Sequence, residues 1–103
     1  MRTITAERLR NAASERDVVA LAREYLGEWL PEEIGRLPPE CRPVKLLDGD
    51  DLSNLAVNLA LATTSFEIEP EDLRMVEELD AFIGSACRRV AEIQRRKTPA
   101  THH

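Results

Sequence analysis

Histidine is almost missing from this sequence: His102 and His103, adjacent at the C-terminus, are the only two. They are typical of a tag remnant or a frayed tail. A Ser-His-Asp or Cys-His arrangement needs an imidazole inside the fold, and residues 5–99 contain none. The four glycines stand far apart, so no Gly-rich phosphate loop is present. We therefore expect a protein that is not an enzyme and that has no cofactor.

Cysteine is equally scarce, and so are long apolar runs. Cys41 and Cys87 form no Cys-x-x-Cys pair, which predicts two free thiols. The longest uncharged run, residues 52–66, is shorter than the ~20 residues of a membrane-spanning helix and contains serine, asparagine and threonine. Residues 1–14 carry charges where a signal peptide would be continuously apolar. These observations predict a cytoplasmic protein that does not enter the membrane.

Basic residues are outnumbered, with 14 Lys and Arg against 19 Asp and Glu and a net charge of -5. This balance disfavours nonspecific attraction to nucleic acid and favours a basic partner. Asp48, Asp50 and Asp51 cluster in one loop but lack the glycine and closing glutamate of a calcium loop, so no metal site is expected. At 103 residues, the chain has room for one domain, 1–103, of which 98–103 is expected to be a frayed tail.

Helix signals account for most of the sequence. Ile4 and Leu9 have the spacing of a hydrophobic staple, which predicts a short helix over residues 5–13. Ser14 with Asp17 resembles a capping box, and the apolar spacing after it predicts a helix over 15–30. Pro31 suits the first position of an extra helical turn over 31–37, and the prolines that follow predict an extended or irregular segment over 37–45.

Two further helices complete the expected fold. An Asp-capped helix over 51–64 carries almost no charge, and a long helix over 70–97 opens with Pro70 and acidic residues. No strand pattern of useful length is present. The sequence therefore predicts an all-α fold, a small four-helix bundle with one extra turn, in which the uncharged helix is central.

The length of the last helix raises the question of what covers it. At about 1.5 Å per residue it is about 40 Å long, about twice the length of the uncharged helix. Ile83, Val90 and Ile93 on its C-terminal half therefore need cover, either from the first helix folding back or from a second copy of the chain. We favour the two-fold dimer.

Two other groups of residues are candidates for binding. Asn54, Asn58 and Ser65 share a strip of the uncharged helix and either bond within the bundle or contact a partner. The C-terminal end of the last helix is basic and could contact phosphate, although cations also stabilise a helix C-terminus by pairing with its negative pole. The basic residues of this end are Arg88, Arg89, Arg95, Arg96 and Lys97.

The function that best fits these features is a non-catalytic, acidic helical interaction protein of the adaptor, chaperone or inhibitor kind, with another protein as its partner. The alternative is a nucleic-acid-binding regulator that uses the basic helix end. The Arg-, Ala- and Leu-rich composition suggests a bacterial source.

Overall fold

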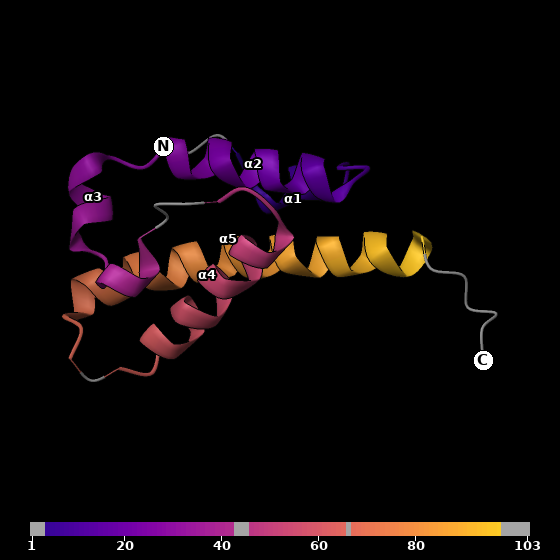
Figure 1. Ribbon diagram of the computed structural model, residues 1–103. Helices are drawn as coiled ribbons and strands as arrows, with labels where there is room; N and C mark the ends of the chain where they lie inside the picture. Colours follow the sequence, from indigo (N-terminus) through magenta and orange to yellow (C-terminus); the bar gives the residue numbers. More distant parts are fainter. Residues whose placement is uncertain (1–3, 43–45, 66, 98–103) are drawn as a thin grey trace.

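The structure of the protein, a computed structural model, describes residues 4–42, 46–65 and 67–97 (Figure 1). Its elements are all helical. They are α1 (Ala6–Leu9), α2 (Glu15–Gly27), α3 (Pro31–Arg36), the 3-10 helix η1 (Pro39–Cys41), α4 (Gly49–Ala62) and α5 (Pro70–Lys97). The all-α fold predicted from the sequence, a small helical bundle, is confirmed; the fifth α-helix, α3, is the extra turn expected over 31–37. The expected tail at 98–103 lies outside the described residues.

Side-chain caps mark the starts of α2 and α4. The Ser14 hydroxyl accepts a hydrogen bond from the Asp17 amide at 3.1 Å, and the Asp48 carboxylate accepts one from the Asp51 amide at 3.0 Å. Each bond satisfies a backbone donor that the first turn of a helix leaves free. The starts of α2 and α4 therefore agree with the sequence to within two residues, and α5 has the predicted bounds.

Other boundaries were wrong. The first helix was expected over 5–13, but α1 ends at Leu9 and the chain continues in tight turns, in which the amides of Asn11 and Ala12 bond three residues back. Thr5 makes no side-chain cap, so a helix this short has little to extend it. The second helix was expected to reach residue 30, but α2 ends at Gly27. The segment expected to be irregular contains η1.

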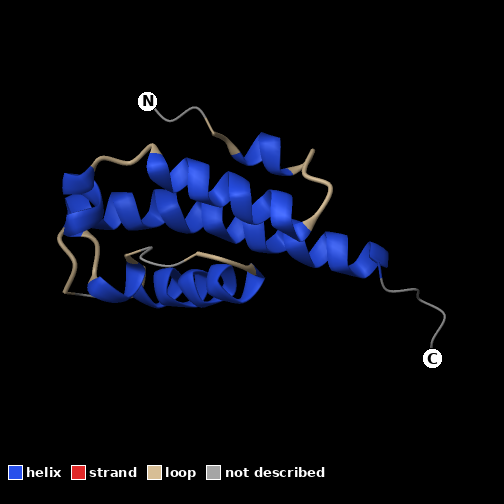
Figure 2. Ribbon diagram, turned by 45° about the horizontal axis from the view of Figure 1, so that its top comes forward, coloured by secondary structure: helices blue, strands red, loops and turns tan. Residues whose placement is uncertain are grey.

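α5, and not α4, is the central helix of the bundle. α5 contacts α1, α2 and α4, and Figure 2 shows it between α2 on one side and α4 on the other. The prediction of a central uncharged helix was therefore wrong. The physical reason is that one side of α4 packs on α5 while the opposite side stays open: Val57 and Leu61 are 58% and 65% exposed. The lack of charge predicted burial of α4 on all sides, but α4 has one buried apolar face and one exposed apolar face.

The C-terminal half of α5 is covered within a single chain. Ile83, Val90 and Ile93 are all buried, with exposures of 0%, 8% and 4%. α1 folds back over α5, which is the alternative to the expected dimer. These three side chains therefore belong to the core of the monomer, and the reason for expecting a dimer through them no longer exists.

Polar side chains tie the helices together around this core. The Glu15 carboxylate on α2 accepts hydrogen bonds from the Gly49 amide at 3.2 Å and from Gln94 at 3.0 Å, which links the ends of three helices. A methyl group on Gly49 would lie 2.7 Å from the Glu15 oxygen, so glycine permits this close approach. Arg23 similarly donates to the Leu46 carbonyl oxygen at 3.1 Å, which ties α2 to the segment before α4.

Candidate functional site

One side of α4 is open and exposes two large apolar side chains, Val57 and Leu61. Buried residues of α4 lie on one side of the helix; they are Leu52, Leu55, Leu59 and Ala62. Asn54, Val57 and Leu61 lie on the opposite side, about half a helical turn away at 100° per residue, and all three are exposed. We call this surface, defined by Asn54, Val57 and Leu61, the outer face of α4. Large apolar side chains one turn apart on an exposed surface are a feature of interaction sites.

A pocket opens beside the outer face, where α4 ends and η1 passes over it. It has a volume of about 480 Å³. Its lining residues come from three segments of the chain: Pro38, Pro39, Glu40, Asn58, Leu61, Ala62, Ser65, Glu67 and Ile68. We call it the α4–η1 pocket. Because Leu61 belongs to both, the pocket and the outer face of α4 form one continuous surface.

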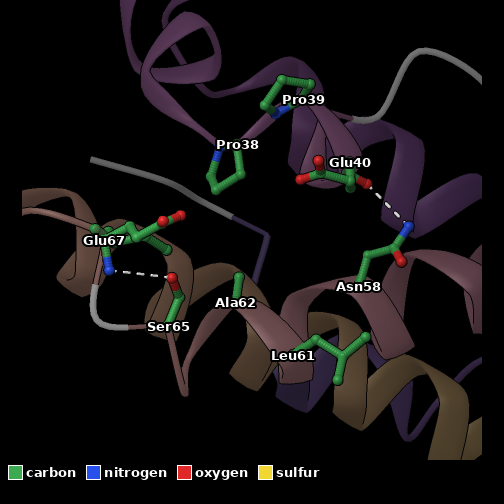
Figure 3. Close-up of a pocket in the computed structure, with 9 residues that line it drawn as sticks. Pro38, Pro39, Glu40, Asn58, Leu61, Ala62, Ser65 and Glu67 are labelled. Atoms are coloured by element: carbon green, nitrogen blue, oxygen red, sulfur yellow. Dashed lines mark hydrogen bonds between the residues drawn. The ribbon is translucent and has the colours of Figure 1, made fainter.

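The walls of the pocket are held by hydrogen bonds that Figure 3 shows. Asn58 donates from its side-chain amide to the Glu40 carbonyl oxygen at 3.0 Å, which fixes η1 against α4. The Ser65 hydroxyl accepts from the Glu67 amide at 3.2 Å and orders the turn after α4. The two prolines form one wall, opposite Leu61 and Ala62. Proline has a fixed φ and few rotamers, so this wall is stiff and preformed.

The candidate strip of Asn54, Asn58 and Ser65 is thus divided between two roles. Asn58 and Ser65 line the pocket and bond to backbone groups of the chain itself, whereas Asn54 is exposed on the outer face. The sequence pattern indicated this strip but not Val57, Leu61 or the two prolines at the start of η1, Pro38 and Pro39. One signal was present: leucine or valine occurs on every side of an uncharged helix, which leaves more apolar surface than one neighbour can cover.

The basic end of α5 is partly used within the chain. Arg89 donates from Nε and Nη2 to the Ala12 carbonyl oxygen, at 3.2 Å and 2.7 Å, and pairs with Glu92 at 3.2 Å. Arg88 donates to the Ser85 hydroxyl at 3.0 Å. Glu92 lies four residues after Arg88 and three before Arg95, so a carboxylate sits among the candidate phosphate contacts. Arg88, Arg95 and Arg96 are exposed, and the Lys97 side chain lies outside what the structure describes.

The two hydrogen bonds from Arg89 to Ala12 lead to a first testable expectation. Arg89→Ala should lower the free energy of unfolding by about 1.5–3 kcal/mol, because a charged donor that closes the α1–α2 turn against α5 is lost. Arg95→Ala, an exposed arginine on the same helix, should change it by less than about 0.5 kcal/mol. Chemical denaturation followed by circular dichroism measures both. Equal effects of the two variants would contradict the structural role of Arg89.

Both cysteines are free and lack the environment of a reactive thiol. Burial raises the pKa of Cys41 above the usual thiol value, and the negative charge of Glu40 raises it further. Burial also raises the pKa of Cys87, although a hydrogen bond with Ser53 and the charge of Arg88 act in the lowering direction. The neutral thiol is therefore the main form of each at neutral pH.

Neither a metal-type cluster nor a membrane-spanning helix occurs in the described ranges. Within them, no group of three or more His, Cys, Asp or Glu side chains is arranged to hold a metal ion. None of the helices in the same ranges has the length and apolar character required to cross a bilayer. Comparison of the chain with protein families, curated proteins and solved structures finds no match.

Proposed function

We propose that the protein is a non-catalytic interaction module of the adaptor, chaperone or inhibitor kind that binds another protein. The partner would contact the outer face of α4 and the adjoining α4–η1 pocket. The observation that carries this proposal is the exposure of Val57 and Leu61, 58% and 65%, beside a preformed pocket. Both side chains would be covered in a complex, and burial of apolar area is the main favourable term in protein association.

The location of this surface supports the proposal. The buried side of α4 already packs on α5, so the outer face is not needed to hold the bundle together. The fold therefore keeps its own core while it presents a second apolar surface. A reducing compartment such as the cytoplasm fits the two free thiols.

The test is capture of a partner by the immobilised protein from a lysate of the source organism after nuclease treatment. The double variant Val57→Gln with Leu61→Gln should lose the partner by about tenfold or more, since each truncated apolar contact is worth about 1.5–3 kcal/mol. Glutamine keeps the helix propensity and adds no charge. Leu30→Gln is the matched control, because Leu30 is also 58% exposed but lies at the start of α3.

Two outcomes would contradict the proposal. Retention of the same proteins by the wild type and by the double variant would show that the outer face of α4 is not the binding surface. Loss of all bound material on nuclease treatment would instead favour nucleic-acid binding through Arg88, Arg95 and Arg96. Circular dichroism of each variant confirms that the fold is intact.

A further inference from the structure

The chain around the α4–η1 pocket has a strong charge bias. Between Lys45 and Arg74 the sequence has no basic residue at all. The same stretch carries seven carboxylates: Asp48, Asp50, Asp51, Glu67, Glu69, Glu71 and Asp72. None of the residues that line the pocket is positively charged, while Glu40 and Glu67 are carboxylates on its exposed rim. In the part of the chain that the structure describes, no ion pair joins either of these two to a cation, whereas Asp72 is paired with Arg36 at 2.7 Å.

The end of α4 adds to this negative charge. The pocket lies at the C-terminal end of the helix, where the last carbonyl groups give the helix its negative pole. The hydroxyl groups of Thr63 and Thr64 donate to the carbonyl oxygens of Ala60 and Leu61, at 2.7 Å and 2.8 Å. These carbonyl groups are thus hydrogen-bonded to neutral donors, and among the described residues none of the hydrogen bonds to them comes from a cationic side chain. A positively charged group in the pocket would be favoured both by the helix end and by two carboxylates.

The size and charge of the surface favour a short segment over a second copy of the chain. α4 has 14 residues, a length of about 21 Å, and its outer face presents only two large apolar side chains. A stable interface between globular partners buries about 800 Å² on each side, which is more surface area than the outer face of α4 supplies. A second copy packed face to face would also bring an identical set of carboxylates to the contact, and like charges oppose association.

We propose that the outer face of α4 and the α4–η1 pocket bind a basic amphipathic helix of a partner protein. Its apolar side chains, spaced three or four residues apart, pack on Val57 and Leu61 as in other helix-in-groove complexes. A lysine or arginine at one end of that apolar row enters the pocket between the η1 prolines and Leu61 and pairs with Glu40 or Glu67. This assignment rests on the proposed function, because it names the partner of the same surface.

A peptide selection tests the assignment. A display library of random 16-residue peptides is selected against the wild-type protein and, in parallel, against the Val57→Gln, Leu61→Gln variant. Peptides that depend on the outer face of α4 should be enriched in lysine or arginine next to apolar residues at helical spacing. Their affinity for the variant Glu40→Gln with Glu67→Gln should fall about fivefold, the effect of losing one partly solvated ion pair whichever carboxylate forms it.

The matched control is Glu24→Gln with Glu77→Gln, which removes the same net charge from exposed positions on α2 and α5. Its affinity for the peptides should stay within about twofold of wild type, because distant exposed charges are screened by salt. If outer-face-dependent peptides are neutral or acidic, or if the two double variants behave alike, the basic-helix assignment is overturned while the proposed function stands. If no selected peptide depends on Val57 and Leu61, the proposed function fails as well.

Discussion

Replacing Ile83 by aspartate is expected to unfold the chain. Ile83 has no exposed surface and lies on the side of α5 that faces the other helices. The substitution removes a fully buried aliphatic side chain, which costs about 2–5 kcal/mol. It also places a carboxylate in a core that, among the described residues, contains no buried polar or charged residue. Because a domain of this size has a total stability of about 5–15 kcal/mol, the sum of these two costs is enough to abolish folding. Loss of the helical circular dichroism signal at 25 °C is the measurement.

The same variant separates the two explanations of the α5 seam. A dimer held together by Ile83, Val90 and Ile93 would dissociate into a folded monomer when Ile83 becomes aspartate. The core position in the structure predicts general unfolding instead, and a folded monomeric Ile83→Asp protein would contradict it. Leu61→Asp supplies the control, since Leu61 is 65% exposed and the substitution should leave the thermal unfolding midpoint nearly unchanged.

The starts of the helices were predictable because their causes are local. Ser14 and Asp48 satisfy amides three residues ahead of them, and a proline at a first helical position costs no hydrogen bond. The long helix after Glu69 has both a start signal and a regular apolar row over its whole length, and its bounds agree with the sequence. α1 lacked such support: its spacing resembled a staple, but Thr5 makes no side-chain cap.

The arrangement of the helices was less predictable because it depends on contacts between distant residues. α4 is apolar on several sides, so the sequence does not say which side packs on α5 and which stays open.

The candidate site was hard to predict for the same reason, because it depends on contacts between distant residues. Asn58 was identified from its position on α4, but its partner is the backbone of Glu40, which η1 places there through a turn of two prolines. Val57 and Leu61 were not identified, because nothing in a single helix distinguishes its two apolar faces.

Phe82→Ala should have the second largest effect on stability. Phe82 on α5 stacks on Tyr25 of α2, with ring centroids 3.8 Å apart and planes within 5° of parallel. Tyr25 in turn meets the edge of Trp29 at 6.2 Å. This aromatic cluster joins α2 to the central helix, and truncation of a buried phenylalanine costs about 3–5 kcal/mol. Urea denaturation followed by the fluorescence of Trp29, the single tryptophan, measures the loss.

Phe82→Leu distinguishes ring stacking from simple filling of space. Leucine keeps most of the apolar volume but none of the ring contact, so its cost should be clearly smaller than that of alanine, yet measurable as the loss of about 0.5–1.5 kcal/mol of aromatic pairing. Equal losses for the two variants would mean that the stack itself, and not the buried volume, holds α2 against α5. A loss below about 1 kcal/mol for Phe82→Ala would contradict the packing of α2 on α5.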